Sequence, residues 1–168
     1  GTEQDCAVIA DIYNYAVVHT AAIWNDKTVD TSNRIQWMAQ RQSLGYPVLV
    51  AVENEQVIGY ASFGDWRAFD GFRHTVEHSV YVHPEHGGKG TGRALMVALV
   101  EAAKACGKHV MVAAIESQNA ASLHLHATLG FTVTGQMPQV GTKFGRWLDL
   151  TFMQLQLDNR TDPDALHE

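Results

Sequence analysis

The sequence predicts an α/β (α+β) domain in which a mixed central sheet of about six to seven strands is flanked by about four helices. β-rich runs and stretches with helical periodicity alternate along the chain, and a glycine-rich stretch separates one β-rich run from a long helix. A chain of 168 residues that is 46% hydrophobic can bury one sizeable core but not two. We therefore expect a single domain over residues 1–157 and a flexible acidic tail over 158–168.

The first part of the chain predicts two helices and a hairpin. Apolar residues recur at helical spacing over Ala7–Val18 and again over Asn33–Leu44, which is followed by Gly45. Two β-rich runs come next, Pro47–Val52 and Val57–Phe63, with a short polar turn between them. Two strands joined so closely are expected to pair as a hairpin.

The rest of the chain alternates strands and helices. The predicted elements are a loop at 66–72, a strand at 76–82, a helix from 94 to 106 closed by Gly107, a buried strand at 109–115, a helix at 119–129 stopped by Gly130, and two strands near 131–134 and 147–157. Together with the hairpin, these strands complete a mixed sheet.

The glycine-rich stretch Gly87-Gly88-Lys89-Gly90-Thr91-Gly92-Arg93 lies between the strand at 76–82 and the following helix. Glycines let backbone N–H groups approach a ligand, and the free N–H groups at a helix start favour a phosphate. A Walker loop is excluded because Lys89 is followed by Gly90, and the G-x-G-x-x-G fingerprint fails at Arg93 and at Leu95. The remaining G-x-G-x-G pattern suits a pyrophosphate, and a glycine-rich turn without a ligand is the alternative.

Charge and composition make several classes of partner poor candidates. Much of the formal net charge of −6 comes from the tail, where four acidic residues stand against Arg160. No basic run marks a surface for nucleic acid or an anionic membrane. With no apolar stretch of about 18 residues and no signal-peptide pattern, we expect a soluble, cytoplasmic protein. The two cysteines, Cys6 and Cys106, make no disulfide framework.

The element order, the glycine-rich stretch, Asn119-Ala120-Ala121-Ser122 and Leu129-Gly130-Phe131 together resemble the GNAT superfamily of N-acetyltransferases. The resemblance covers about Asp5 to Leu157 and implies a sheet with a splayed strand pair that binds acetyl-CoA as co-substrate. It implies a pyrophosphate cradle and two contacts with the pantetheine arm. The residues are Gly88, Lys89, Gly90, Thr91, Gly92 and Arg93 for the cradle, Asn119 for one contact, and the backbone of Val80, Tyr81 and Val82 for the other.

Two features depart from the family's pattern. The family usually opens its phosphate loop with Gln or Arg, where this chain has Gly87, so weaker coenzyme binding is expected. The family also begins with a short strand, whereas this chain starts almost directly on its first helix. The second departure bears on stability more than on chemistry.

Several blocks look like the branch of the family that acetylates phosphinothricin, methionine sulfoximine and methionine sulfone. These blocks are Thr20-Ala21-Ala22-Ile23-Trp24-Asn25, Gly45-Tyr46-Pro47, Gly59-Tyr60-Ala61-Ser62, Trp66-Arg67 and Thr75-Val76-Glu77-His78-Ser79-Val80-Tyr81-Val82. The branch acts on a free amino acid, and the resemblance implies substrate contacts from two segments: Arg67, Ala68 and Phe69, and Glu77, His78 and Ser79. Members of the branch are commonly dimers, so a homodimer is implied as well.

The side chains suit such a substrate. Arg67 can hold an α-carboxylate because a guanidinium offers two parallel N–H donors. Trp24, Trp66, Phe69 and Phe72 can wall a pocket for a short side chain. The alternative is that the aromatic residues belong to the core and that Arg67 is solvated.

Glu77 is the candidate general base, because the reaction needs an unprotonated amine to attack a thioester. Burial in a central strand would raise the pKa of its carboxyl group toward the useful range, and the alternative is a structural salt bridge with Arg73 or Arg67. A backbone N–H near Val80 would hold the oxyanion. For the leaving thiolate the family often has a Tyr where this chain has His126, which either donates a proton as imidazolium or only packs.

Nine histidines raise the question of a metal site. His74 and His78 lie on or beside a strand, and His124 and His126 point to different faces of a helix, so no ligand set closes. We expect no metal, with His83 and His86, which are beside the phosphate loop, solvated or facing the phosphate.

The favoured interpretation is an acetyl-CoA-dependent N-acetyltransferase acting on a small amino-acid-like substrate. Two alternatives remain open: a non-catalytic acyl-CoA-binding module, and an acetyltransferase for protein N-termini or lysines.

Overall fold

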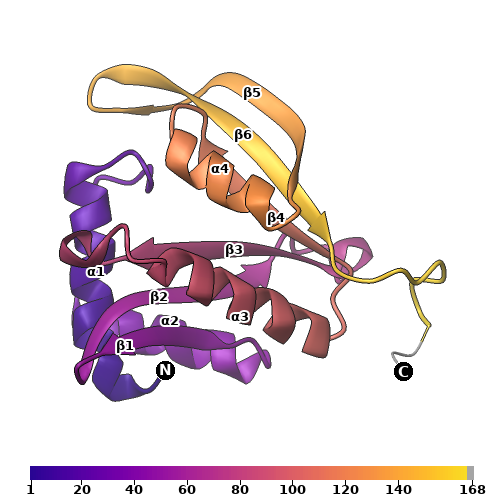
Figure 1. Ribbon diagram of the computed structural model, residues 1–168, viewed down its shortest axis with the longest axis horizontal. Coiled ribbons are helices and arrows are strands. Elements are labelled where there is room, and N and C mark those ends of the chain that lie inside the picture. The colour runs from indigo at the N-terminus through magenta and orange to yellow at the C-terminus, as the bar shows by residue number, and fades with distance from the viewer. Residues whose placement is uncertain (166–168) are drawn as a thin grey trace.

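The computed structural model describes residues 1–165 and contains four helices and six strands in that range. Figure 1 labels them in chain order. They are α1 (Cys6–His19), α2 (Thr31–Ser43), β1 (Val48–Glu53), β2 (Gln56–Asp65), β3 (Thr75–Val82), α3 (Thr91–Ala105), β4 (Val110–Glu116), α4 (Ala120–Thr128), β5 (Thr132–Lys143) and β6 (Arg146–Gln156), with short 3₁₀ turns at Glu3–Asp5, Asp70–Phe72 and Pro84–His86.

The six strands form one sheet in the order β1-β2-β3-β4-β6-β5. The β3–β4 pair is parallel and the other neighbouring pairs are antiparallel, so the sheet is mixed. One face is covered by α1 and α2, whose buried residues pack on β1 and β2, and the other by α3 and α4. The predicted α/β class, the mixed sheet and the four helices are confirmed.

The central pair, β3 and β4, separates soon after it begins. Pairing between the two strands covers only Thr75–Glu77 opposite Val110–Val112. Beyond that point β3 stays paired with β2, and β4 stays paired with β6. The strands therefore diverge and leave a gap in the middle of the sheet, which is the splayed pair that the resemblance implied.

The larger core lies between the sheet and α3. Leu95, Met96, Leu99 and Ala103 recur at helical spacing along α3 and are buried against the sheet. Burying each of the larger side chains contributes about 1.5–3 kcal/mol. Because this face fixes α3 on the sheet, it also fixes the glycine-rich loop from which the helix begins.

The last two strands differ from the prediction. The strand predicted near 131–134 extends to Lys143, because two register shifts, at Val133/Gly135 and Met137/Gly141, let it continue past Pro138. Such irregularities are tolerated here because β5 is an edge strand. Gly and Pro, which usually end a strand in a sequence pattern, mark bulges in this one.

Both ends of the described chain contact the body. No strand precedes α1 in residues 1–165, and the terminal ammonium of Gly1 donates to the Val48 carbonyl at 2.8 Å. In the tail, Arg160 donates to the Gly107 carbonyl at 3.0 Å, and the Asp164 carboxylate lies 2.6 Å from Arg73. These contacts tie much of the tail to the segments that precede β4 and β3, whereas the flexibility expected for residues 166–168 lies outside the described residues. Within the described part, no helix is long and apolar enough to cross a membrane.

Candidate active site

Two adjoining cavities open where β3 and β4 diverge. The larger, about 360 Å³, is lined by Trp24, Arg41, Glu77 and Leu150 among others. The smaller, about 100 Å³, extends to Asn119 and His126. Both are lined by His78, Ser79, Tyr81, Ala114 and Glu116. The gap therefore connects a carboxylate on one side of the sheet with the α4 helix on the other.

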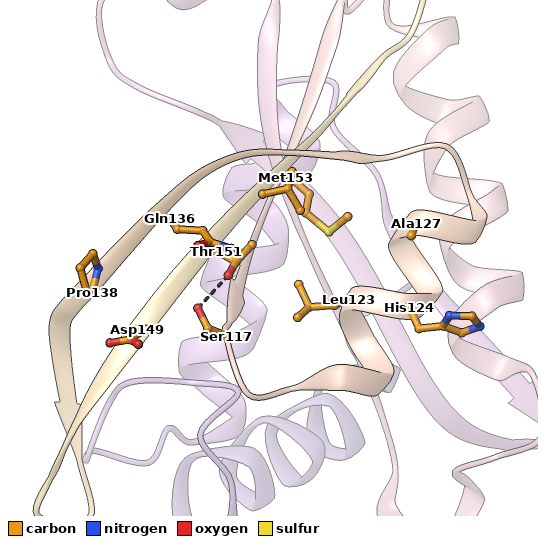
Figure 2. Close-up of a pocket in the computed structure, with 10 residues that line it drawn as sticks. Ser117, Leu123, His124, Ala127, Gln136, Pro138, Asp149, Thr151 and Met153 are labelled. Atoms are coloured by element: carbon orange, nitrogen blue, oxygen red, sulfur yellow. Dashed lines mark hydrogen bonds between the residues drawn. The ribbon is translucent and has the colours of Figure 1, made fainter.

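A still larger cavity, about 490 Å³, lies between α4 and the β5–β6 hairpin (Figure 2). Three of its polar side chains already have partners: the hydroxyl groups of Ser117 and Thr151 are 2.7 Å apart, and the Asp149 carboxylate accepts from the backbone N–H of nearby Gln139 at 2.7 Å. Its other walls include the apolar Leu123 and Met153. We therefore place the candidate active site in the gap and not in this cavity.

Glu77 lies at the last position where β3 pairs with β4, and it is half-buried. Burial raises the pKa of its carboxyl group, and the nearby guanidinium of Arg41 partly opposes this shift. The structural salt bridges considered from the sequence are not formed: Arg73 pairs with Asp164, and the Arg67 guanidinium lies over the Phe72 ring at 5.6 Å. The carboxylate is thus available to the cavity.

Arg41, on α2, is the cation that lines this cavity, and sequence analysis missed it. Its guanidinium crosses β2 at Gly64, where a Cβ atom would lie 2.6 Å from the Arg41 Nη1 atom. Burial and the neighbouring Arg34 lower the pKa of Arg41. In the sequence, Arg41 is one of several polar residues on the same helix and has no distinguishing pattern. The one sequence feature connected with its position is Gly64, which leaves room for the guanidinium.

Trp24 forms a wall of the same cavity, as the sequence suggested. Its indole N–H donates to the Ala21 carbonyl at 2.8 Å, and its ring packs so closely on β5 that a Cβ at Gly141 would overlap it. The buried ammonium of Lys143 donates to the carbonyls of Ala16, Thr20 and Ile23. These bonds hold the segment after α1 against β5.

The segment Arg67, Ala68 and Phe69 is not brought into this cavity. The chain leaves the sheet after Asp65, and the Trp66 ring packs edge-on against Phe152, with ring centroids 5.5 Å apart. Phe69 is 71% exposed, and Trp66 and Phe72 line a separate hollow. Of the two predicted substrate segments, the structure therefore brings only Glu77, His78 and Ser79 to the site.

The glycine-rich loop has the geometry expected of an anion cradle. Gly88 and Gly90 have φ of 77° and 80°, which side chains rarely adopt. The first backbone bond inside α3 runs from the Ala94 N–H to the Gly90 carbonyl, so the preceding N–H groups, those of Thr91, Gly92 and Arg93, have no partner within the helix. Lys89 lies 3.8 Å from Glu53, and Arg93 donates to Thr128 at 3.0 Å.

The backbone of β3 offers further groups to the gap. The His83 N–H donates to the Ile58 carbonyl at 2.7 Å, so every second residue back along β3, including Tyr81, bonds to β2. The N–H and C=O groups of Val80 and Val82 consequently point toward the gap, whereas those of Tyr81 do not. Asn119 caps α4 by accepting from the Ser122 N–H at 3.2 Å, and lines the smaller cavity.

His126 is 1% exposed, and each of its ring nitrogens has a close polar neighbour. Its Nδ1 atom lies 2.7 Å from the Ser122 carbonyl oxygen and its Nε2 atom 2.9 Å from His78 Nε2. Burial lowers the pKa of His126. The imidazolium donor suggested from the sequence is therefore disfavoured, and the packing alternative fits the structure better.

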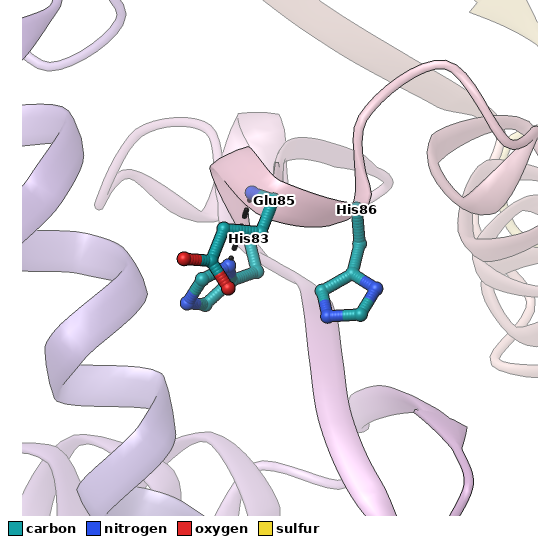
Figure 3. A group of neighbouring side chains, drawn as sticks. All are labelled: His83, Glu85 and His86. Atoms are coloured by element: carbon teal, nitrogen blue, oxygen red, sulfur yellow. Dashed lines mark hydrogen bonds between the residues drawn. The ribbon is translucent and has the colours of Figure 1, made fainter.

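His83, Glu85 and His86 form a group whose ligand atoms lie within 4.8 Å of one another. In Figure 3 both imidazole rings lie below the turn, with His83 on the side of Glu85, and the two ring centroids are 5.5 Å apart. His83 Nδ1 accepts from the Glu85 N–H at 3.2 Å, so in neutral His83 the Nε2 atom carries the proton and neither nitrogen is free for a metal. His86 Nδ1 lies 3.7 Å from Glu53. The group is not arranged as a ready metal site, and the absence of a metal stays a prediction.

Comparison with known proteins gives a consistent result. The model for the acetyltransferase (GNAT) family matches residues 9–131. The L-amino acid N-acyltransferase MnaT of Escherichia coli (strain K12) is 74% identical over 164 residues, which cover 98% of this chain and 95% of that protein. The L-methionine sulfoximine/L-methionine sulfone acetyltransferase of Salmonella typhimurium (strain LT2) is 73% identical over 163 residues, covering 97% and 95%.

A solved structure agrees with these relatives. The acetyltransferase yncA of Salmonella typhimurium, solved with its cofactor acetyl-CoA, superimposes with a TM-score of 0.97 and 71% identity, covering 99% of this chain and 96% of that one.

Proposed function

Because this chain belongs to the GNAT acetyltransferase family, we propose that it transfers the acetyl group of acetyl-CoA to the α-amino group of a small free amino acid or amino-acid analogue. The named activities of its relatives favour methionine sulfone and methionine sulfoximine, with phosphinothricin as a related substrate. The observation that carries the proposal is the gap beside β3, where a half-buried carboxylate, Glu77, and a guanidinium, Arg41, line one cavity.

Acetyl-CoA fits the groups that this chain presents. We propose that its pyrophosphate lies on the Gly88–Arg93 loop, where helix N–H groups lack partners within α3. The pantetheine arm would then run through the gap. There it would bond the backbone groups of Val80 and Val82 that face the gap and the side-chain amide of Asn119. Gly87 offers no side-chain donor to the phosphates, so affinity depends on these backbone groups.

The amino acid is proposed to enter from the side of α1 and α2. Arg41 would hold the α-carboxylate through two parallel N–H donors, and Trp24 would wall the side chain. This assignment replaces Arg67, which does not line the cavity.

Glu77 is proposed as the general base, acting directly or through water on the attacking amine. Its carboxylate takes the proton as the C–N bond forms, because burial has raised its pKa toward the working range. The developing oxyanion would accept from the Val80 N–H, which faces the gap. The thiolate leaves as the C–S bond breaks and takes a proton from solvent, because the Nδ1–H of His126 is committed to the Ser122 carbonyl.

The expected homodimer also stays a proposal. Exposed apolar side chains on the β5–β6 hairpin, among them Phe144 and Trp147, suit an interface between two copies. Sedimentation would detect it as a doubled mass. The cytoplasmic location expected from the sequence also stays a prediction.

The deciding experiment follows thiol release from acetyl-CoA with a panel of free amino acids, the three analogues and short peptides. We expect release with methionine sulfone and methionine sulfoximine and none with peptides. Coenzyme binding without release for any amine would favour the acyl-CoA-binding module. Release with peptides alone would favour the protein acetyltransferase.

A further inference from the structure

The smaller cavity is lined by two histidines that meet through their ring nitrogens. His78 comes from β3, one residue past the last pair with β4, and His126 comes from α4. Their Nε2 atoms are 2.9 Å apart and their rings are parallel to within 4°. Face-to-face rings would keep their atoms about 3.5 Å apart or more. The rings therefore meet edge to edge, so that a proton on one nitrogen points at the lone pair of the other.

The hydrogen-bond network fixes which nitrogen carries each proton. The Ser122 carbonyl can only accept, so His126 Nδ1, at 2.7 Å, must be the donor. In neutral His126 the Nε2 atom is then bare and accepts, which requires His78 to carry its proton on Nε2. His78 Nδ1 is left as a bare acceptor, and it is buried without a hydrogen-bond partner.

The surroundings keep both rings neutral. Burial lowers the pKa of His78 to about 3, with His126 adding to the shift, and burial lowers the pKa of His126 too. The Phe131 ring packs edge-on against both imidazoles, with centroids at 5.9 Å from His78 and 5.1 Å from His126. The acidic residues that share a cavity with His78 are Asp65, Glu77 and Glu116.

A buried acceptor without a partner costs free energy, and such groups are rare in folded proteins. His78 lines both cavities at the point where the strands diverge. We propose that His78 Nδ1 accepts a hydrogen bond from an N–H group of a bound ligand, and that His126 is a positioning residue that holds His78 in the required tautomer. This inference rests on the proposed function, which supplies two such N–H groups: an amide of the pantetheine arm and the incoming amine.

The tautomers can be read directly from the wild-type protein. Correlation NMR spectra of the imidazole nitrogens at pH 7 should find the proton of His78 on Nε2 and that of His126 on Nδ1. A proton on His78 Nδ1, or a doubly protonated ring, would overturn the proposal. This readout does not depend on turnover, so it remains valid even if the substrate has been misassigned.

Matched variants of His78 test the acceptor. Asn places a carbonyl oxygen near the position of Nδ1, whereas Leu fills similar space with no acceptor. We expect His78→Leu to weaken binding of the donor ligand by about tenfold, and His78→Asn to recover most of that loss. The dissociation constant of acetyl-CoA, measured without amine, changes if the donor is the pantetheine amide. If the donor is the amine, only the KM for methionine sulfone changes.

A second pair of variants covers the case in which His78→Leu does not fold. His126→Gln keeps an acceptor opposite the His78 Nε2–H, and His126→Leu removes it. The proton of His78 should stay on Nε2 in the Gln variant and distribute over both nitrogens in the Leu variant. Equal spectra for the two variants, or a folded His78→Leu protein with unchanged constants beside an active wild type, would refute the inference. An inactive wild type that does not bind acetyl-CoA would refute the proposed function instead.

Discussion

Glu77 combines a half-buried carboxyl group with a raised pKa and a place at the point where two strands diverge. As a base it must be ionised, so activity should fall with decreasing pH through a pKa above that of an ordinary glutamate. We expect Glu77→Gln to lower kcat by about 10²–10⁴-fold near neutral pH. Part of the rate should return at high pH, where the amine loses its proton unaided. A pH–rate profile of both proteins checks this. If the variant reacts at the wild-type rate at all pH values, Glu77 is not the general base.

The same substitution should affect stability in the opposite direction. Since the pKa of Glu77 is raised in the folded protein, its contribution to stability is greatest at low pH and declines as pH rises through that pKa. Glutamine does not ionise, so at neutral pH Glu77→Gln should melt no lower than the wild type. Thermal unfolding at pH 5 and pH 8 measures the difference, which should favour the variant more at the higher pH.

Arg41 and Arg67 offer two competing anchors for the substrate carboxylate. Arg41 lines the cavity of Glu77, and Arg67 lies over Phe72 outside it. We expect Arg41→Gln to raise the KM for methionine sulfone by about tenfold or more, because a charge-assisted bidentate contact is lost. The KM for acetyl-CoA should change little. Steady-state kinetics of Arg67→Gln provides the comparison. A larger rise in the KM for methionine sulfone in that variant would show that Arg67, in the 66–72 loop, binds the carboxylate instead.

The edge strand β5 shapes the site through its glycines. Gly141 lets the Trp24 ring pack on the strand, whereas a Cβ at Gly135 of the same strand would meet nothing within 4 Å. Gly141→Ala should displace Trp24 and raise the KM for the amino acid several-fold. Gly135→Ala is the matched control and should leave that KM near the wild-type value. Equal KM values in the two variants would show that Trp24 does not shape the pocket.

Most elements could be predicted from the sequence because their signals are local. Helical spacing located α1, α2 and α3, and the apolar run at 109–115 located β4. The full length of β5 could not be predicted, because Gly135, Pro138 and Gly141 are ordinary turn signals that tertiary pairing overrode. For the site, the phosphate loop and Glu77 follow from motif and strand context, whereas Arg41 depends on how α2 packs over Gly64.

Coenzyme binding should change the hydrogen-exchange rates of individual backbone amides. The Val80 and Val82 N–H groups face the gap, while the Tyr81 N–H is bonded to β2. We expect acetyl-CoA to slow hydrogen exchange at Val80 and Val82 and to change Tyr81 much less. Amide exchange followed by NMR with and without the coenzyme checks this alternation. Uniform slowing along β3 would indicate general stabilisation and not a direct contact.

The brief pairing of β3 with β4 has a consequence for how the protein holds together. Within residues 1–165, only three register pairs join β1-β2-β3 to β4-β6-β5, so the sheet consists of two halves that meet over a short stretch of backbone. A pantetheine arm lying in the gap would bond the backbone of β3 where β4 no longer pairs with it, and so would take the place of a neighbouring strand while it is bound. Loading with coenzyme at a hundredfold excess over its dissociation constant adds about 2.7 kcal/mol to the unfolding free energy. Acetyl-CoA would thus be both the acetyl donor and a ligand that stabilises the contact between the two half-sheets.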